Sequence, residues 1–373
     1  MQIVPFLLIV TLFCSCQSAQ PPEMKYFKAE HENFSYSGRS ISSAEGRELI
    51  ASAASVSTRV AGDTVTVFLK SNNENHQYVA VEINKEHLGR FSIKKETLKF
   101  ALPASDSTSL LTVYKETEAS NGNIIFSGLR VQNTEKPAEE KRAKIEFIGD
   151  SITCGMGADT SEINCEEGEW YDQHSAYMAY GPRVARALEV DFEVNCVSGM
   201  GMYRNWNDED QPVMPDVYPY LHLIPNKGQK AEVKEENAPQ IVSIALGTND
   251  FSLGDQQKER SPFNAEKFRE NYIGFIKTIF DRYPNTKVAL ISSPMAGENE
   301  GEELISILKD IKRELADHPV EVFEFQKMTA EGCTGHPSVE DHAAMAEKLL
   351  PFYRELLLKD YPKSTPVLEE KTS

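Results

Sequence analysis

Two residues far apart in this chain have the side-chain chemistry of acyl transfer. Ser151 lies in a Gly-Asp-Ser turn directly after an apolar run, and His336 lies in a glycine-rich loop near the C-terminus. A serine hydroxyl can attack a carbonyl carbon when a histidine takes its proton, and the histidine then returns that proton to the leaving alkoxide. Ser151 is therefore the candidate nucleophile and His336 the candidate general base.

Acyl transfer also needs hydrogen-bond donors for the oxygen that becomes negative in the tetrahedral intermediate. Two further stretches, around Gly199 and around Asn249, supply candidates for this oxyanion hole. The backbone N–H groups of Ser151 and Gly199 and the side-chain amide of Asn249 give three donors, with Gly201 as the alternative glycine. Losing one such donor typically lowers kcat by about 10²–10³.

The elements that must position these residues form an alternation of strands and helices. The predicted strands lie at residues 145–148, 192–197, 241–246, 288–292 and 320–325, and the predicted helices at residues 175–188, 265–282, 302–316 and 339–358. This alternation predicts a parallel sheet with helices on both faces. Ser151, Gly199 and Asn249 each follow a strand, so we expect them at the edge where the carboxyl ends of the strands meet. Ser338 as N-cap, with Asp341 three positions later, predicts the start of the last helix.

The N-terminal part of the chain has a different pattern. Apolar and polar residues alternate in short runs between residues 64 and 113, and turn-forming residues separate these runs. Regularly spaced short strands without helices predict an antiparallel sandwich. We therefore expect a jelly-roll-like β-sandwich over residues 24–135, an α/β domain with a parallel sheet over residues 143–361 and a tail over residues 362–373.

The composition is that of a soluble globular protein. Of the 373 residues, 40% are hydrophobic and 26% are charged, which is enough material for two domains with apolar cores. The net charge of -18 argues against nucleic acid or an anionic membrane surface as a partner. The cysteines have none of the spacings typical of metal sites, so we expect no metal or cofactor, and we expect a monomer.

The first residues predict export. Pro5–Phe13 is an apolar run too short to span a bilayer, as in a secretory signal peptide, although Met1-Gln2 lacks the usual basic residue. Phe13-Cys14-Ser15-Cys16 resembles a lenient bacterial lipobox, which predicts a signal over residues 1–16 and lipidation of Cys16. Cleavage near Ala19 without lipidation and a buried N-terminal helix are the alternatives. The expected location is the periplasm or the outer membrane of a Gram-negative bacterium, with the lipid anchor as the only membrane contact.

Four cysteines follow the predicted signal, namely Cys154, Cys165, Cys196 and Cys333. An exported chain permits disulfides. Cys154 and Cys165 flank a loop and could form a bridge, but the sequence does not determine the pairing. Single buried thiols are the alternative interpretation.

Taken in order, the motifs resemble those of the SGNH, or GDSL-like, hydrolases. The matching motifs over roughly residues 143–361 are Gly149-Asp150-Ser151, the later glycine, Gly247-Thr248-Asn249-Asp250 and His336-Pro337. Ser-Gly-x-Gly-x-x-Arg-Asn at 198–205, Gly-Cys-x-Gly-His-Pro at 332–337 and the preceding sandwich are similar to one branch, the acetyl esterases of carbohydrate esterase family two. The resemblance implies a metal-free esterase that removes acetyl groups from plant polysaccharides such as xylan or glucomannan. It also implies the roles given above for Ser151, His336, Gly199 and Asn249.

One departure from the SGNH pattern leaves alternatives open. These hydrolases usually carry an acid two or three residues before the histidine, where this chain has Thr334 and Cys333. In a comparable Ser-His-Asp triad, replacing the acid by its amide cost about 10⁴ in kcat. A backbone carbonyl near Cys333 or Thr334 could orient the imidazole of a Ser-His dyad instead, and Glu331 or Asp341 could act as the acid. The other functional hypotheses are an inactive glycan-binding protein and an SGNH esterase or lipase that acts on lipid or thioester substrates.

Several side chains near the proposed site are candidates for substrate contact. Aromatic rings can stack on sugar rings, but large aromatic residues are also common in cores. The candidate platforms are Trp170, Tyr203, Trp206 and Phe251. We expect Arg204 and Asn205 to fix the loop at residues 198–205, called the glycine loop below. We expect His174 and His222 to lie at the surface, and His342 to lie inside the last helix in a packing or surface role.

Overall fold

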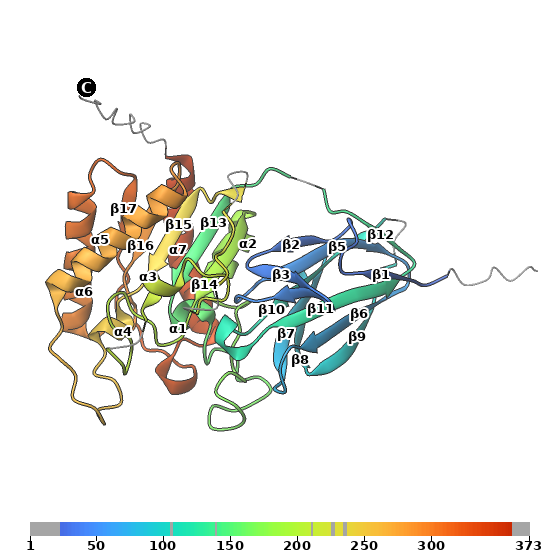
Figure 1. Cartoon of the computed structure of the whole chain (residues 1–373), viewed down its shortest axis with the longest axis horizontal. Helices are drawn as coiled ribbons and strands as arrows, with labels where there is room; N and C mark the ends of the chain where they lie inside the picture. Colours follow the sequence, from blue (N-terminus) through green and yellow to red (C-terminus); the bar gives the residue numbers. More distant parts are fainter. Residues whose placement is uncertain are drawn as a thin grey trace, which may run out of the picture.

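The computed structural model describes residues 23–104, 107–138, 140–209, 212–224, 228–233 and 237–359. In this part of the chain, a β-sandwich and an α/β domain lie side by side (Figure 1). The predicted signal, the predicted lipidation site Cys16 and the predicted tail lie outside the described residues.

The N-terminal unit consists of two antiparallel sheets. Its strands are β1 (Lys25–Lys28), β2 (Ser35–Ser37), β3 (Ser40–Ser43), β4 (Gly46–Leu49), β5 (Ser55–Ala61), β6 (Thr64–Ser71), β7 (Gln77–Ile83), β8 (Glu86–Ile93), β9 (Lys95–Ala101), β10 (Ser109–Lys115), β11 (Ile124–Val131) and β12 (Asn133–Glu135). One sheet has the order β3-β4-β11-β6-β9 with β1 on β11, and the other has the order β12-β5-β10-β7-β8 with β2 on β5. In β6, Val65, Val67 and Leu69 are buried and their neighbours are half-exposed, which confirms the predicted period of two.

The C-terminal unit is built on a five-stranded parallel sheet with the order β14-β13-β15-β16-β17. The strands are β13 (Lys144–Gly149), β14 (Asp191–Cys196), β15 (Ile241–Ala245), β16 (Lys287–Ile291) and β17 (Val320–Phe323). The helices of this unit are α1 (Ser151–Cys154), α2 (Tyr180–Leu188), α3 (Met214–Val217), α4 (Thr248–Phe251), α5 (Ala265–Arg282), α6 (Glu298–Glu314) and α7 (Val339–Leu358), with a short 3-10 turn η3 (Cys333–Gly335). A further 3-10 turn, η1 (Ala119–Asn121), lies in the N-terminal unit between β10 and β11. Because the strand order reverses at β13, loops on both sides of this strand open at the carboxyl edge of the sheet.

Two apolar layers hold the helices against the parallel sheet. On one face, Phe147 of β13 packs edge-on against Tyr180 of α2 and Tyr353 of α7. On the other face, the next residue of the strand, Ile148, belongs to a cluster with Phe268 of α5 and with residues of α3 and α6. Successive side chains of a strand point to opposite faces, so β13 is buried on both sides. The predicted fold class, a sandwich followed by a parallel α/β domain, is confirmed.

The two long helices with clear end signals have the predicted bounds, α5 and α7. At the start of α7, the Ser338 hydroxyl accepts a hydrogen bond from the Asp341 N–H, and the Asp341 carboxylate accepts one from the Ser338 N–H. This reciprocal pair is the predicted capping box.

The helix that we predict from residue 175 begins at Tyr180 instead. Backbone donors in the preceding segment are bound by the sandwich, because Ala176 N–H donates to the Glu116 carbonyl (3.2 Å) and Tyr177 N–H donates to the Glu116 carboxylate (2.8 Å). These contacts bind the segment to the sandwich outside the helical ladder. A partner distant in the sequence therefore overrides the local helical pattern here.

A buried arginine ties the sandwich to the edge strand of the parallel sheet. Arg39 is 6% exposed, and its guanidinium donates to Asn195 Oδ1 in β14 (2.5 Å) and to the carbonyls of Tyr218 (2.9 Å) and Tyr220. Each of these acceptors belongs to the α/β domain. These hydrogen bonds of the Arg39 guanidinium therefore all cross the boundary between the two units.

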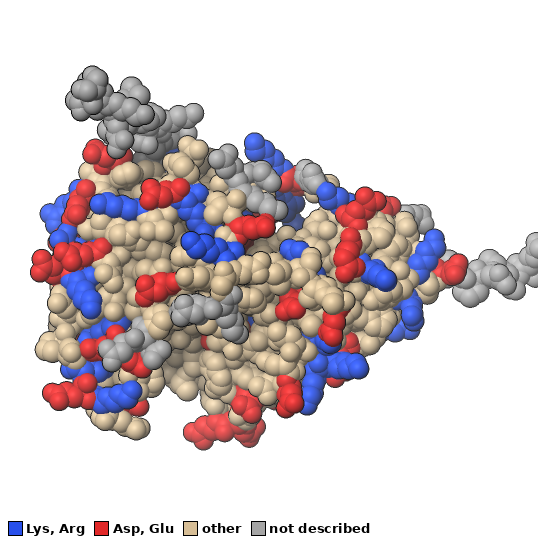
Figure 2. Space-filling model, viewed as in Figure 1, with Lys and Arg blue, Asp and Glu red and all other residues tan. Residues whose placement is uncertain are grey.

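The outer surface carries both signs of charge. Figure 2 shows acidic and basic side chains interspersed over one face of the molecule, without a continuous basic area on that face. Among the helices that the structure describes, none is long and apolar enough to cross a membrane.

Candidate active site

The candidate nucleophile lies at the sharp turn from β13 into α1. Asp150 is the N-cap of α1, and its Oδ1 accepts a hydrogen bond from the Ile152 N–H (3.0 Å). A Cβ atom on Gly149 would lie 2.0 Å from Thr153 Oγ1, so only glycine permits this tight turn. Ser151 is the first helical residue, and its own N–H therefore has no acceptor within the helix.

The structure brings His336 to Ser151 across a separation of 185 residues. The His336 Nε2 atom lies 2.8 Å from Ser151 Oγ, and Nδ1 lies 3.1 Å from the Thr334 hydroxyl oxygen. The Thr334 hydroxyl donates its hydrogen to the Cys333 carbonyl (2.7 Å), so its oxygen accepts from Nδ1–H. This leaves the Nε2 lone pair to accept a hydrogen bond from the serine.

Asp341, one of the two carboxylates that the sequence offers as the acid beside His336, has other hydrogen-bond partners. Its Oδ2 accepts from the Glu331 N–H, the Ser338 N–H and the Ser338 hydroxyl, so it serves the loop and the helix cap. Burial lowers the pKa of His336, and the backbone carbonyls of Thr334 and Cys333 partly offset this effect because they favour the protonated ring. The groups that face the ring in place of an acid are thus the Thr334 hydroxyl and the backbone carbonyls of Thr334 and Cys333, the carbonyls expected from the sequence.

The loops that follow β13, β14 and β15 start at the same level of the sheet. Gly149 pairs with Cys196 on one side and with Ala245 on the other, so Gly199 and Asn249 follow neighbouring strand ends. Gly199 has a φ of +78°, a conformation that favours glycine. Among the residues that the structure describes, its N–H has no hydrogen-bond acceptor, as an oxyanion donor requires.

The other two candidate donors are already engaged. The Gly201 N–H donates to Asn205 Oδ1 (3.2 Å), which favours Gly199 over Gly201 as the oxyanion glycine. The Asn249 amide donates to the Met200 carbonyl (2.8 Å) and to Asp150 Oδ2 (3.2 Å). To stabilise an oxyanion, Asn249 must exchange one of these bonds, and the longer bond to Asp150 is the weaker one.

A buried carboxylate that the sequence reasoning did not single out holds the far side of the glycine loop. Asp250 accepts hydrogen bonds from three successive backbone N–H groups, those of Met202 (2.9 Å), Tyr203 (2.8 Å) and Arg204 (3.2 Å). Burial raises the pKa of Asp250 to about 6, against the lowering effect of these donors. The Arg204 Nε atom returns a bond to the Asp250 carbonyl (2.6 Å), so Arg204 fixes the loop as predicted.

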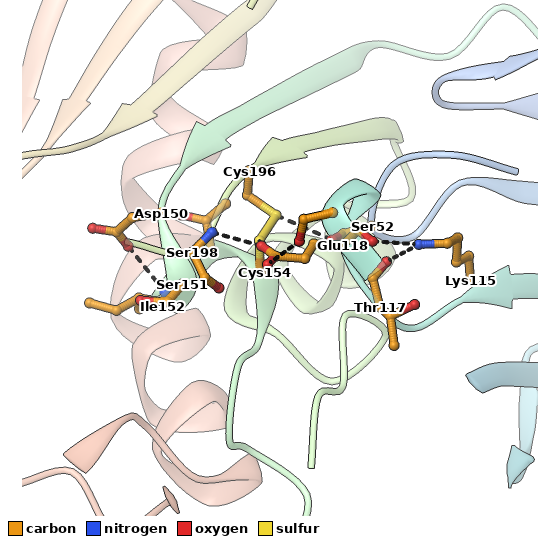
Figure 3. The surroundings of a disulfide bond; sticks show 12 residues. Ser52, Lys115, Thr117, Glu118, Asp150, Ser151, Ile152, Cys154, Cys196 and Ser198 are labelled. Carbon is orange, nitrogen blue, oxygen red and sulfur yellow. Dashed lines mark hydrogen bonds between the residues drawn. A yellow bond between two sulfur atoms is a disulfide. The ribbon is translucent and has the colours of Figure 1, made fainter. Parts of the chain in front are cut away.

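Two disulfides surround the site, and they correct our expectations for the cysteines. Cys154 bonds to Cys196 and Cys165 bonds to Cys333, with Cα–Cα distances of 5.5 Å and 5.0 Å. The suggested Cys154–Cys165 bridge is wrong, as is the alternative of single thiols, because the fold brings together residues 42 and 168 positions apart. The first disulfide joins the nucleophile helix α1 to the strand that leads to Gly199 (Figure 3). The second joins the loop around residue 165 to the loop of His336.

The four candidate aromatic platforms divide into two pairs. Trp170 and Trp206 are 49% and 45% exposed, and the backbone N–H of Trp206 donates to the Gly199 carbonyl (2.7 Å). Tyr203 is buried and its hydroxyl accepts from the Asn264 N–H (3.0 Å), while Phe251 is partly buried and stacks on a neighbouring phenylalanine against the core. Of the four candidates, only the two tryptophans are exposed. Trp206 adjoins Gly199, and Trp170 follows the loop that the Cys165–Cys333 disulfide joins to the loop of His336.

The remaining histidines differ in burial from one another. His174 is fully buried beneath Trp170, with ring centroids 4.9 Å apart, so the surface prediction is wrong for it; burial lowers its pKa to about 3. His222 is half-buried. His342 is buried in α7 and accepts from the Tyr180 N–H (3.3 Å), as the packing interpretation predicts. Within the described part of the chain, no three His, Cys, Asp or Glu side chains gather in a group that could hold a metal ion.

Two family profiles divide the chain where the fold does. The profile of the GDSL-like lipase/acylhydrolase family matches residues 145–349, and the profile of the carbohydrate esterase 2 N-terminal domain matches residues 36–140. The first match covers the nucleophile, the glycine loop and His336. The second covers most of the sandwich.

Individual proteins are also similar to this chain. An acetylxylan esterase/glucomannan deacetylase of Cellvibrio japonicus is 31% identical over 243 residues, which are 63% of this chain and 65% of that protein. A second protein of that name from the same organism is 25% identical over 310 residues, covering 81% of this chain and 83% of its own. The structure of a family two carbohydrate esterase from Clostridium thermocellum in complex with cellohexaose is 27% identical, with a TM-score of 0.75 over 87% of this chain and 99% of that chain. The chain thus spans just under two thirds of the first of these relatives.

The comparisons confirm the resemblance that the motifs indicated. The GDSL-like profile extends over more than half of the 373 residues, and the N-terminal profile precedes it as the sandwich precedes the α/β domain. The chain therefore belongs to the GDSL-like lipase/acylhydrolases and, within them, to carbohydrate esterase family two.

Proposed function

We propose that this protein is a serine carboxylic ester hydrolase whose catalytic groups are Ser151 and His336. The observation that carries the proposal is the 2.8 Å contact between Ser151 Oγ and His336 Nε2. The other ring nitrogen of His336, Nδ1, faces the Thr334 hydroxyl. A hydrogen-bonded nucleophile and base, with a third group that orients the base, is the arrangement that activates a serine. Here the third group is a neutral hydroxyl.

In the proposed cycle, His336 removes the proton of Ser151 as its oxygen attacks the ester carbonyl. The N–H groups of Ser151 and Gly199 and the amide of Asn249 stabilise the oxyanion. Asn249 gives up its 3.2 Å bond to Asp150 as this charge develops. His336 then protonates the leaving alkoxide, and water resolves the acyl-enzyme by the same steps in reverse, without a cofactor.

We infer that the substrates are acetylated plant-type glycans such as acetylated xylan or glucomannan. Two relatives are named acetylxylan esterase/glucomannan deacetylase, and a related structure is a complex with cellohexaose. The exposed rings of Trp170 and Trp206 beside the loops of the site support binding of sugar rings.

The test is hydrolysis of 4-nitrophenyl acetate and 4-nitrophenyl butyrate by the wild type and by Ser151→Ala, followed by release of acetate from acetylated xylan and glucomannan. Acetate-selective turnover that disappears in Ser151→Ala is the expected result. Equal rates for wild type and variant, together with retention on a polysaccharide column, would instead identify an inactive glycan-binding protein. Preference for the butyrate ester would point to longer acyl chains in lipid or thioester substrates.

We also propose that the protein is exported and that Cys16 carries a lipid. Two disulfides in a chain of this size are typical of an oxidising compartment. Metabolic labelling with a fatty acid, compared between the wild type and Cys16→Ser in a Gram-negative host, tests the anchor. A labelled wild type and an unlabelled variant are expected, and an unlabelled wild type would leave cleavage near Ala19 as the better interpretation. We propose a monomer, which gel filtration of the cleaved protein tests.

A further inference from the structure

A glutamate of the sandwich reaches the loop that carries the proposed oxyanion donor Gly199. Glu118 lies between β10 and η1 and is 2% exposed. Its Oε2 atom accepts a hydrogen bond from the backbone N–H of Ser198, at 2.7 Å, and Ser198 directly precedes Gly199. Figure 3 shows Glu118 between the sandwich and the loop of the α/β domain that begins at Ser198.

The same carboxylate touches the other half of the site. Glu118 Oε2 lies 3.1 Å from the sulfur of Cys154, the last residue of the nucleophile helix α1. Because Cys154 is in a disulfide, its sulfur has no hydrogen and this contact is packing. One oxygen atom thus contacts both the element that carries Ser151 and the loop that carries Gly199.

The position of Glu118 is itself fixed from the sandwich side. The Lys115 ammonium, fully buried, donates to the carbonyls of Thr117 (2.6 Å) and Glu118 (2.8 Å), and the Ser120 hydroxyl donates to Glu118 Oε1 (2.7 Å). These bonds hold the turn after β10 in one conformation. Buried polar groups that are fully satisfied in this way rigidify their surroundings.

We propose that Glu118 is a positioning residue of the oxyanion hole, supplied by the β-sandwich to the α/β domain. The Gly199 N–H belongs to the peptide unit between Ser198 and Gly199. Anchoring the Ser198 N–H fixes the preceding peptide unit, and Asp250 fixes residues 202–204 beyond it. The flexible Gly199 is therefore held from both sides, one side from each domain, with its N–H free for the oxyanion. This proposal rests on the function proposed above.

A second buried glutamate of the same interface offers a matched control. Glu116 is two residues away, is fully buried and accepts from the Tyr177 N–H at 2.8 Å, also across the domain boundary. It makes no described contact with the loop after Ser198. Removing either carboxylate weakens the interface, but of the two only Glu118 binds the residue that directly precedes the proposed oxyanion donor Gly199.

The experiment compares Glu118→Ala, Glu118→Asp, Glu118→Gln and Glu116→Ala with the wild type and Ser151→Ala on 4-nitrophenyl acetate. The fraction of competent sites is titrated with diethyl 4-nitrophenyl phosphate, and kcat is expressed per titrated site. We expect Glu118→Ala to lower kcat per site about 10- to 100-fold with KM within about 2-fold, less than the loss of a donor itself. Glu116→Ala is expected to lower the melting temperature with kcat per site within about 2-fold of the wild type.

The Asp and Gln variants keep the proposal testable if Glu118→Ala does not fold. Gln keeps an acceptor oxygen at the same distance. Because burial raises the pKa of Glu118, a neutral amide suits this position, and we expect Glu118→Gln to retain most of kcat. Asp keeps the charge, but its side chain is one methylene shorter and its oxygen lies farther from Ser198. We therefore expect Glu118→Asp to lower kcat per site about 10-fold. Equal kcat per site for all three Glu118 variants and the wild type would overturn the positioning role, as would an equal loss in Glu116→Ala. If the wild type hydrolyses 4-nitrophenyl acetate no faster than Ser151→Ala, the proposed esterase function is wrong, and the inference about Glu118 is then wrong as well.

Discussion

Replacing Thr334 tests how the imidazole of His336 is oriented without an acid. In the structure the Thr334 oxygen accepts from Nδ1–H at 3.1 Å, while its hydrogen is bound to the Cys333 carbonyl. Thr334→Val removes this acceptor with almost no change in volume, and Thr334→Ser keeps it. Thr334→Asp places a carboxylate two residues before the histidine, where SGNH hydrolases usually carry their acid.

The expected magnitudes follow from the strength of one neutral hydrogen bond. Such a bond contributes about 0.5–1.5 kcal/mol, which corresponds to about 2- to 12-fold in rate. We therefore expect Thr334→Val to lower kcat by that factor, far less than the roughly 10⁴ that a charged orienting group is worth in a full triad. Thr334→Asp should raise kcat, and the left-handed backbone at this position (φ 54°) tolerates aspartate better than a β-branched residue.

The pH dependence of kcat/KM supplies the second measurement. The base must be neutral, so activity falls as the pH falls through the pKa of His336, and burial holds this pKa below the ordinary 6.5. A carboxylate at position 334 stabilises the protonated ring and should move the acid limb up by about 1 pH unit or more. Thr334→Val should move it slightly down. If Thr334→Val and Thr334→Ser have the same kcat and the same acid limb, the hydroxyl does not orient the ring and our reasoning is wrong.

Three further outcomes can be measured on the same protein. Asn249→Ala should lower kcat on 4-nitrophenyl acetate by about 10²–10³; a loss below about 3-fold would mean that the amide stays bound to Asp150 and Met200 throughout. Replacing both Cys165 and Cys333 by serine should lower the free energy of unfolding by about 2–5 kcal/mol, measured by denaturant titration, and an unchanged midpoint would contradict this. His342 stays neutral in the fold because burial lowers its pKa to about 3. The unfolded state therefore binds more protons than the folded state below pH 6.5. Between pH 6.5 and 5, the free energy of unfolding of the wild type should fall by about 1.4 kcal/mol per pH unit more than that of His342→Asn.

The sequence was sufficient wherever an element contains its own signals. Helix α7 begins with a capping box at Ser338 and Asp341 and repeats its apolar residues along one side, so both of its ends could be predicted. The edge that carries Ser151, Gly199 and Asn249 followed from the rule that parallel strands end together. No step of that inference required knowledge of a distant contact.

The sequence was insufficient wherever a residue depends on a partner from the other domain. The segment before Tyr180 is not helical, because its backbone N–H groups donate to Glu116 of the sandwich. Nothing in the local sequence pattern indicates this contact. The disulfide pairing likewise depends on which loops the fold brings within about 6 Å. Glu118 is one acidic residue among 57 acidic residues in a charged sequence. Only its burial and its bond to Ser198 distinguish it.

Three buried carboxylates hold the backbone of this site, each at a different place. Asp150 binds the start of the nucleophile helix, Glu118 the near side of the glycine loop and Asp250 its far side. Burial raises the pKa of each, to about 7 for Asp150 and about 6 for Asp250. As the pH rises above the ordinary pKa of a carboxyl group, the unfolded chain ionises before the folded one, so these groups lower the stability of the fold at neutral pH. A fold that retains such residues around one site gives up stability to fix the direction of N–H groups in advance, which is what oxyanion stabilisation requires. Because one of the three comes from the sandwich, the N-terminal unit is part of the proposed catalytic apparatus, whatever it contributes to binding glycans.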